Sequence, residues 1–257
     1  MKPYSAWKQL IRLIMPSSLF NQVAPLLRLI LKFVYSGGKH QCPCCESNLR
    51  KFADDSEICP VCGSGKRQRL QWLVLDRKFT FFDSDADVLD IAPMQYFQDY
   101  CLQHSSLKYL SADLNSELAM DKIDLTAAPY PDCSFDFILC SHVLEHIPDD
   151  RAAMMEMYRL LRPAGIALIQ VPLQDQPTYE DVSITNPLQR TTHFGQADHV
   201  RIYGSDITQR LRNVGFSVIS ETCADLFPLS ELEYFSLDEK DIIFTAKKPE
   251  NDQINSG

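Results

Sequence analysis

The sequence predicts an α/β fold built on a mostly parallel sheet, preceded by a small metal-binding unit. The first observation is the stretch 134–171, in which two short apolar segments flank a loop and an amphipathic helix. A strand, a crossover helix and a second strand form a βαβ unit, whose strands lie parallel in one sheet. The second observation is a pair of C-P-x-C motifs within residues 41–66, which is the spacing of a zinc site.

The βαβ unit begins with a buried strand. Residues 135–140 form an apolar run after a turn-rich stretch, as expected of a strand covered on both faces. Asp149 or Asp150 then caps a helix whose apolar residues fall on one face. Pro163 ends this helix because proline lacks a backbone donor, and residues 166–171 form the second strand.

Two stretches of this unit carry a family resemblance: FDFILCSHVLEHIPDD and YRLLRPAGIALIQVP. They resemble the fourth strand, loop, helix and fifth strand of class I S-adenosylmethionine (SAM)-dependent methyltransferases, and the similarity extends over about 87–248. The HVLEHI-type loop is typical of the branch that modifies small molecules. The resemblance implies a Rossmann-like, seven-stranded, mostly parallel sheet with helices on both faces. The alternative is a doubly wound α/β domain without methyl chemistry.

Charge and cysteine usage limit the functional classes. The net charge is −9, but residues 1–45 hold six Lys or Arg and no Asp or Glu, so the rest of the chain carries −15. An acidic body argues against broad nucleic-acid binding, which requires basic surface. Five of the nine cysteines fall within 42–62, and the other four, in or beside apolar runs, are expected to be buried free thiols. We therefore predict a cytoplasmic protein.

Residues 1–40 predict a basic amphipathic helical arm. Apolar residues recur on one helical face over 7–14, and a second apolar helix is expected over 26–35, after a turn at 17–21. No apolar run approaches the roughly 18–20 residues that span a bilayer. Two interpretations remain open, namely peripheral contact with an anionic membrane surface, or packing against the catalytic domain or a partner.

The two C-P-x-C motifs predict a structural zinc site. Each motif forms a turn that points two thiolates at one ion, and two such turns supply a tetrahedron of sulfur ligands. The predicted ligands repeat one spacing: Cys42, Cys45, Cys59 and Cys62. Cys44 is a surplus thiol, His40 is a weaker substitute ligand, and iron is the main competing metal.

The predicted organisation has four parts: an arm (1–40), a zinc-knuckle unit (41–66), a methyltransferase domain (67–248) and a disordered tail (249–257). A basic cluster stands at the junction of the second and third parts: Lys66, Arg67 and Arg69. A solvated helix face is the expected role of this cluster. Contact with an anionic substrate or RNA is the alternative.

The first strand of the predicted sheet ends in a turn that departs from the family pattern. Asp90 occupies the acidic position, but Ala92 stands where the first glycine is usual, and Met94 and Tyr96 occupy later glycine positions. Because SAM has no pyrophosphate to cradle, the need for glycine is weaker than in dinucleotide sites. We predict that Asp90 and the turn Ala92-Pro93 bind SAM. The alternative is a degenerate domain that has lost the cofactor.

Further cofactor-binding residues follow the next two strands. Asp113 ends the second strand, 23 residues after Asp90, where these folds place a carboxylate for the ribose hydroxyls, and Leu114 follows it. A turn or helix cap is the alternative role of Asp113. The resemblance implies that Asp124 binds the adenine amino group and that the backbone of Leu125 holds the ring.

Residues for catalysis are expected at the carboxyl end of the fourth strand and in a long insert at 172–203. Ser141 is expected to contact the cofactor, and His142 to contact it or to act as a base. The insert supplies further candidates for acceptor binding or proton removal: His193, His199 and Arg201. Lid hydrogen bonding is the alternative role of these three residues.

The remaining chain completes the predicted sheet with a helix over 205–214 and strands over 216–220 and 241–247. The predicted function is SAM-dependent methyl transfer to a small-molecule or carbohydrate-like acceptor. Two alternatives remain. One is an RNA-modifying methyltransferase that uses the zinc unit as a reader, and the other is a non-catalytic scaffold that binds a partner or membrane through 1–40.

Overall fold

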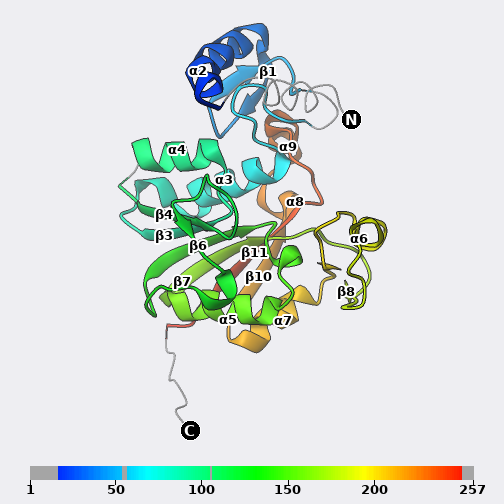
Figure 1. The fold of residues 1–257 in the computed structure, drawn as a ribbon. Helices are drawn as coiled ribbons and strands as arrows, with labels where there is room; N and C mark the ends of the chain where they lie inside the picture. Colours follow the sequence, from blue (N-terminus) through cyan, green and yellow to red (C-terminus); the bar gives the residue numbers. More distant parts are fainter. Residues whose placement is uncertain (1–16, 54–56, 105, 251–257) are drawn as a thin grey trace. The chain divides into compact units, whose positions relative to one another are not determined.

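The computed structural model describes residues 17–53, 57–104 and 106–250 (Figure 1). Contacts divide the chain into two compact units. The cysteine unit contains the residues up to Thr80 together with Thr222–Asp241, and the sheet unit contains Phe81–Glu221 and the residues from Ile242 onward. Residues 67–80 and 222–241, which we assigned to the methyltransferase domain, therefore group with the cysteines. The helix predicted over 7–14 and nearly all of the tail lie outside the described residues.

The sheet unit contains a seven-stranded sheet in the order β10-β11-β7-β6-β3-β4-β5. The strands are β3 (Asp87–Ile91), β4 (Lys108–Asp113), β5 (Asp121–Lys122), β6 (Phe135–Ser141), β7 (Leu161–Gln170), β10 (Ser217–Thr222) and β11 (Ile242–Lys247). The pairs from β7 through β5 are parallel, whereas β11 runs antiparallel to β7. The predicted mostly parallel, seven-stranded sheet is confirmed.

The centre of this sheet explains its apolar sequence. Ile138 of β6 pairs with Leu89 of β3 on one side and Ala167 of β7 on the other, and all three residues are fully buried. A strand flanked by parallel neighbours and covered on both faces needs apolar residues throughout rather than alternation. In Figure 1, α4 lies on one face of the sheet, and α5 and α7 lie on the other.

The helices of the sheet unit are α4 (Gln95–His104), α5 (Asp150–Leu160), α6 (Pro187–Phe194) and α7 (Ile207–Val214). Asp149 caps α5, because its carboxylate accepts from the Ala152 amide at 2.9 Å. Gly215 ends α7 with φ +123°, and a Cβ there would lie 2.9 Å from the Tyr158 ring. Only glycine fits this position without strain.

The insert between β7 and α7 contains α6 and a small antiparallel pair, β8 (Tyr179–Glu180) and β9 (Arg201–Ile202). Three single 3₁₀ turns complete the unit: η1 (Phe81–Asp83), η2 (Leu125–Ala127) and η3 (Leu144–His146). The last of these turns lies in the loop after β6. The insert is therefore folded rather than an open loop.

The cysteine unit combines the amino-terminal part of the chain with a segment between the last two strands. Its elements are α2 (Ser17–Val34), β1 (Ser36–Cys42), β2 (Ser47–Leu49), α3 (Lys66–Phe79), α8 (Cys223–Leu226) and α9 (Leu229–Phe235). The turn expected at 17–21 is wrong, because α2 begins at Ser17 and is continuous. None of the helices in the described part of the chain is both long and apolar enough to cross a bilayer.

Arg69 holds the two segments of the cysteine unit together. The side chain is fully buried, and its guanidinium donates to the carbonyls of Phe235 at 2.7 Å and Ser236 at 2.6 Å. It also donates to the carbonyls of Glu57 and Ser64, each at 2.9 Å. A buried guanidinium requires such partners because desolvation disfavours its charge. The expectation of a solvated face or a substrate contact is wrong for Arg69.

Candidate active site

The turn after β3 has the backbone conformation that usually requires glycine. Ala92 has φ +57°, in the left-handed region, and its amide donates to the Ala112 carbonyl at 2.9 Å. The tight turn is therefore formed even though alanine replaces glycine. Ala92 is half-buried, the adjoining Pro93 is buried, and Met94 is 40% exposed.

Asp90 lies inside the sheet, just before this turn. The carboxylate is 5% exposed and accepts a hydrogen bond of 2.5 Å from the Tyr109 hydroxyl. Burial raises the pKa of Asp90 to about 7, although the hydrogen bond from Tyr109 acts in the opposite direction. The hydrogen bond links the adjacent strands β3 and β4.

Asp113 lies where β4 ends, beside the turn that follows β3. Its Oδ1 accepts from the amides of Asn115 and Ser116, each at 2.7 Å, and the side chain is half-buried. Leu114 is 55% exposed beside it. An oriented carboxylate next to exposed apolar surface has the chemistry to bind a ribose and an adjoining ring.

Asp124 and Leu125 have different surroundings. Asp124 is exposed, and its Oδ1 accepts from the amide of Thr126 at 2.8 Å and from its hydroxyl at 2.7 Å. The hydrogen bonds from Thr126 lower the pKa of Asp124. Leu125 is buried, so its side chain is not available to a ligand.

The loop after β6 directs polar groups toward the same edge of the sheet. The Ser141 hydroxyl donates to Gln170 Oε1 at 3.0 Å. His142 has φ +58°, and its Nδ1 lies 3.0 Å from Glu145 Oε1. Parallel sheets bind ligands at the carboxyl ends of their strands. Ser141 and His142 therefore lie where a cofactor or acceptor is expected.

Arg201 fastens the insert to this loop. It is 4% exposed and donates to the carbonyls of Leu144 at 3.0 Å and Pro148 at 2.8 Å. The Tyr203 hydroxyl donates to Asp150 at 2.7 Å, next to the start of α5. These contacts are the lid hydrogen bonding that was the alternative role of Arg201.

The two histidines predicted in the insert have different environments. His193 is exposed on α6, with its Nδ1 3.0 Å from the Tyr179 hydroxyl. His199 is buried against His146, with ring centroids 4.7 Å apart. The structure thus brings His199 to the β6 loop. We predicted no role for Glu145 from the sequence, because nothing in the sequence indicates that His199, 54 positions away, lies beside it.

The four predicted zinc ligands form one cluster in the cysteine unit. Their sulfur atoms all lie within 4.8 Å of one another, and the pairs Cys42–Cys62 and Cys45–Cys59 are 3.7 Å apart. Zn–S bonds of about 2.3 Å place tetrahedral sulfurs about 3.8 Å apart, so the cluster fits zinc. The surplus Cys44 instead faces the Gln68 carbonyl at 3.9 Å.

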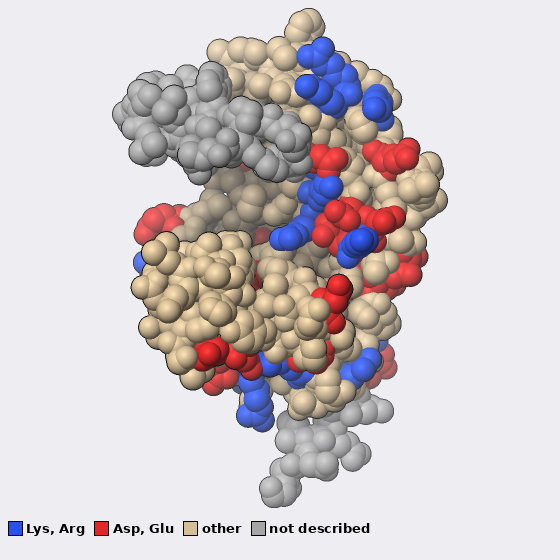
Figure 2. Space-filling view, turned by 90° about the vertical axis from the view of Figure 1, so that its right-hand side faces the viewer, with Lys and Arg blue, Asp and Glu red and all other residues tan. Residues whose placement is uncertain are grey.

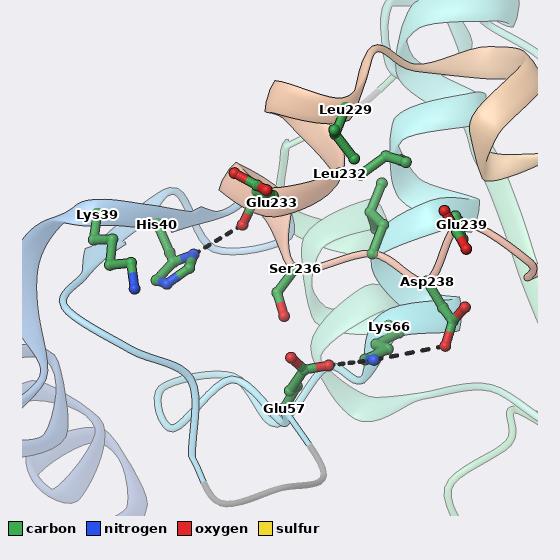
Figure 3. A pocket seen from close by; sticks show the side chains of 11 residues that line it. Lys39, His40, Glu57, Lys66, Leu229, Leu232, Glu233, Ser236, Asp238 and Glu239 are labelled. Carbon is green, nitrogen blue, oxygen red and sulfur yellow. Dashed lines mark hydrogen bonds and ion pairs between the residues drawn. The ribbon is translucent and has the colours of Figure 1, made fainter.

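The cysteine unit also contains a cavity of about 580 Å³, whose lining includes His40, Lys66 and Glu233 (Figure 3). His40, the weaker ligand candidate, has its Nδ1 2.9 Å from the Glu233 carbonyl. Lys66 forms ion pairs with Glu57 and Asp238. In Figure 2, basic and acidic side chains lie beside one another on the face shown. Lys66 and Arg67 of the basic cluster are therefore paired with acids, Arg67 with Asp241 at 3.9 Å, whereas Arg69 donates to backbone carbonyls.

Comparison with known proteins identifies the family. A family model described as "Methyltransferase domain" matches residues 47–221, which is more than half of the chain. The chain belongs to this methyltransferase family. A Mycolicibacterium smegmatis protein named "Probable S-adenosylmethionine-dependent methyltransferase" is 28% identical over 95 residues, 37% of this chain. The match spans about a third (34%) of that relative's length.

Solved structures share the methyltransferase fold. Phosphoethanolamine N-methyltransferase 2 of Haemonchus contortus, in complex with SAM, has a TM-score of 0.50 and 18% identity, covering 72% of this chain and 53% of that one. The cyclase SpnF has a TM-score of 0.50 and 16% identity, covering 91% of this chain and 95% of that one. At this identity the likeness concerns the fold alone, and the second example is named for a different reaction.

The residues at the carboxyl edge fit the cofactor of this methyltransferase family. The left-handed turn at Ala92 brings backbone to the end of β3, and Asp113 offers a carboxylate at the end of β4. Leu114 and Met94 expose apolar surface beside these two groups. SAM has ribose hydroxyls that can donate to a carboxylate and an adenine ring that can pack on apolar surface, so these residues are compatible with it.

Proposed function

We propose that the protein transfers the methyl group of SAM to a small polar or carbohydrate-like acceptor. The observation that carries the proposal is the insert at 172–203, fastened by Arg201 to the loop after β6. A folded cover at the carboxyl edge of a parallel sheet suits a compact acceptor and excludes water. The SAM-bound phosphoethanolamine methyltransferase, which has the same fold, is named for a small acceptor.

The cofactor is assigned to the edge formed by β3, β4 and η2. We assign Asp113 to the ribose hydroxyls, with Leu114 against the neighbouring ring. Asp124 and the backbone of Leu125 are assigned to adenine, and the turn at Ala92-Pro93 to the amino-acid part. When bound, SAM supplies an electrophilic methyl group on a sulfonium. The protein's contribution is to align the acceptor with that methyl group.

His142 is our candidate for the general base, and Ser141 for a cofactor contact. The ring of His142 is held by Glu145 Oε1 at 3.0 Å, which fixes its orientation at the end of β6. An oxygen or carbon acceptor needs such a base, whereas an amine needs only a neutral nitrogen. His193 and His199 remain secondary candidates, and His199 is the weaker because it is buried.

We also propose that the cysteine cluster holds a structural zinc ion. Four thiolates fill a tetrahedral site, which leaves no position for water or substrate. The ion would tie the β1–β2 hairpin to the segment before α3, because Cys42 and Cys45 come from the first and Cys59 and Cys62 from the second.

Two binding measurements test the function. Calorimetric titration of zinc-replete protein with SAM and with its demethylated product should give micromolar binding that Asp113→Ala weakens at least tenfold. Asp85→Ala, which removes an exposed carboxylate before β3, serves as the matched control and should bind like the wild type. A folded, metal-loaded protein that binds neither ligand would contradict the enzyme and favour the non-catalytic scaffold.

The acceptor class needs a second experiment. Protein incubated with methyl-labelled SAM and cell extract should label the small-molecule fraction. Label in RNA instead would support the RNA-modifying alternative. The pairing of Lys66 with Glu57 and Asp238 argues against that alternative, since a reader surface needs unpaired positive charge.

A further inference from the structure

We propose that Glu145, His146 and His199 form a binding site for a divalent transition-metal ion, separate from the cysteine cluster. One carboxylate oxygen and one nitrogen from each imidazole lie within 4.8 Å of one another. Glu145 and His146 belong to the loop after β6, and His199 belongs to the insert. Two imidazoles and a carboxylate are a ligand set for ions such as Zn²⁺, Fe²⁺ and Mn²⁺.

Two atoms of this cluster are buried without a protein partner. Glu145 is fully buried, and His199 is 3% exposed. Within the part of the chain that the structure describes, Glu145 Oε2 and His199 Nε2 form no hydrogen bond. A buried polar atom left unpaired costs about 1–3 kcal/mol. A cation between the two side chains would satisfy both lone pairs at once.

The contacts of the two histidines favour the tautomer that a metal ligand needs. His199 Nδ1 lies 3.0 Å from the Phe194 carbonyl, and a carbonyl can only accept. The hydrogen of the neutral ring is therefore on Nδ1, and Nε2 presents a lone pair. His146 is supported similarly, with Nδ1 3.2 Å from Asp198 Oδ2. Ligating histidines commonly bind a carbonyl or carboxylate through the second nitrogen in this way.

Glu145 is oriented by its own set of contacts. His142 Nδ1 lies 3.0 Å from Oε1, which leaves Oε2 for an ion. The Glu145 carbonyl accepts from the Val200 amide at 2.9 Å, one residue after His199. This backbone bond fixes the spacing between the loop and the insert. The Glu145 carboxylate and the His199 imidazole are therefore held in position without a bound ion.

The cluster suits an ion with an open coordination position. Ligands about 2.1 Å from a tetrahedral ion lie about 3.4 Å apart, so a small inward movement of these side chains is sufficient. Three protein ligands leave room for water or another oxygen donor, in contrast to the closed set of four cysteines. Nitrogen and oxygen ligands also accept harder ions than thiolates do.

The test is a titration of full-length protein whose cysteine cluster already holds zinc. Mn²⁺ is the first probe because it binds thiolate sites weakly and does not displace zinc. Loss of the free Mn²⁺ electron paramagnetic resonance signal should show one ion bound per chain. His199→Asn keeps a donor for the Phe194 carbonyl but lacks Nε2, and Glu145→Gln removes the charge. Each substitution should weaken Mn²⁺ binding at least tenfold.

A matched control and a second readout complete the test. His193→Asn changes an exposed histidine of the same insert, outside the cluster, and should bind Mn²⁺ like the wild type. Mn²⁺ should raise the melting temperature of the wild type and of this control, but not of Glu145→Gln. A wild type that takes up neither one Mn²⁺ nor a second Zn²⁺ would overturn the proposal. Unchanged binding in His199→Asn and Glu145→Gln would do the same.

Discussion

Ala92 carries backbone strain at the proposed cofactor edge. A left-handed conformation costs a non-glycine residue about 1–2 kcal/mol, whereas glycine loses about 0.5–1 kcal/mol more chain entropy on folding. Ala92→Gly should therefore raise the free energy of unfolding by about 0.5–1 kcal/mol, measured by denaturant titration. It should also tighten binding of the demethylated product, because backbone without a Cβ permits closer approach.

Ala164 provides the matched control for this substitution. It has φ +67°, similar to the +57° of Ala92, but it lies near the start of β7 rather than at the carboxyl end of a strand. Ala164→Gly should give a similar gain in stability and leave ligand binding unchanged. A fall in ligand affinity for Ala92→Gly would show that the alanine methyl group itself contacts the cofactor.

Asp90 should make stability depend on pH. Burial raises its pKa from 3.8 to about 7, so the folded protein holds this proton more tightly than the unfolded chain does. The contribution of Asp90 to stability is therefore fully present below about pH 4, falls as the pH rises through 7 and is constant above that. The pKa shift corresponds to a loss of at most about 4 kcal/mol in the free energy of unfolding between these two pH ranges.

Asp90→Asn isolates this effect. Asparagine keeps an acceptor for the Tyr109 hydroxyl but cannot ionise. The variant should be more stable than the wild type at pH 8, by a few kcal/mol at most, and the difference should shrink toward pH 4. Paired urea unfolding curves at the two pH values measure it. A stability difference that is the same at both pH values would contradict a buried, titrating Asp90.

At the scale of elements, the two C-P-x-C turns make a specific prediction about metal content. Cys59 belongs to the cluster, whereas Cys44 faces the Gln68 carbonyl. Cys59→Ser should therefore reduce the zinc bound per chain by one, because a hydroxyl is a poor substitute for a thiolate. Cys44→Ser should leave it unchanged. Metal analysis of dialysed protein measures both, and equal loss in the two variants would place Cys44 among the ligands.

Helix α2 presents apolar side chains to solvent. Leu26, Leu29, Ile30 and Phe33 are 50–86% exposed at helical spacing. Residues 17–53 also carry five Lys or Arg and one Glu, in a chain of net charge −9. We expect the full chain to bind vesicles that contain anionic lipid more tightly than neutral vesicles. The substitution Phe33→Ser should weaken this binding. Val182 is also an exposed apolar residue but lies outside α2, so Val182→Ser should leave the binding unchanged. Equal sedimentation with both vesicle types would contradict the expectation.

Elements with local signals were the predictable ones. The strand β6 and the helix α5 follow from an apolar run and a capping aspartate, which act over a few residues. The strand β7 starts at Leu161, earlier than predicted, because Leu161 pairs with Phe135 across an irregular register that accommodates Pro163. The contact of His199 with the β6 loop depends on tertiary packing, which periodicity does not encode.

At the scale of the whole molecule, the two units are not contiguous in sequence. Residues 223–241 lie between strands β10 and β11 but group with the cysteine unit, where Arg69 binds the carbonyls of Phe235 and Ser236. We predicted that this segment belongs to the methyltransferase domain, because neither its composition nor a motif distinguishes it from the rest of that domain. The chain passes between the units three times.

Each unit has a different proposed stabiliser, so thermal unfolding should show two transitions. Zinc binding is coupled to folding of a small cysteine unit, and SAM binding to folding of the sheet unit. In differential scanning calorimetry of protein that holds zinc in the cysteine cluster alone, a chelator should abolish the transition of the cysteine unit and leave that of the sheet unit nearly unchanged. The demethylated product should raise only the transition temperature of the sheet unit, by a few degrees at about 100-fold excess over the dissociation constant. The substitution Asp113→Ala should remove that rise. A single transition that responds to both treatments would mean that the two units unfold together rather than independently.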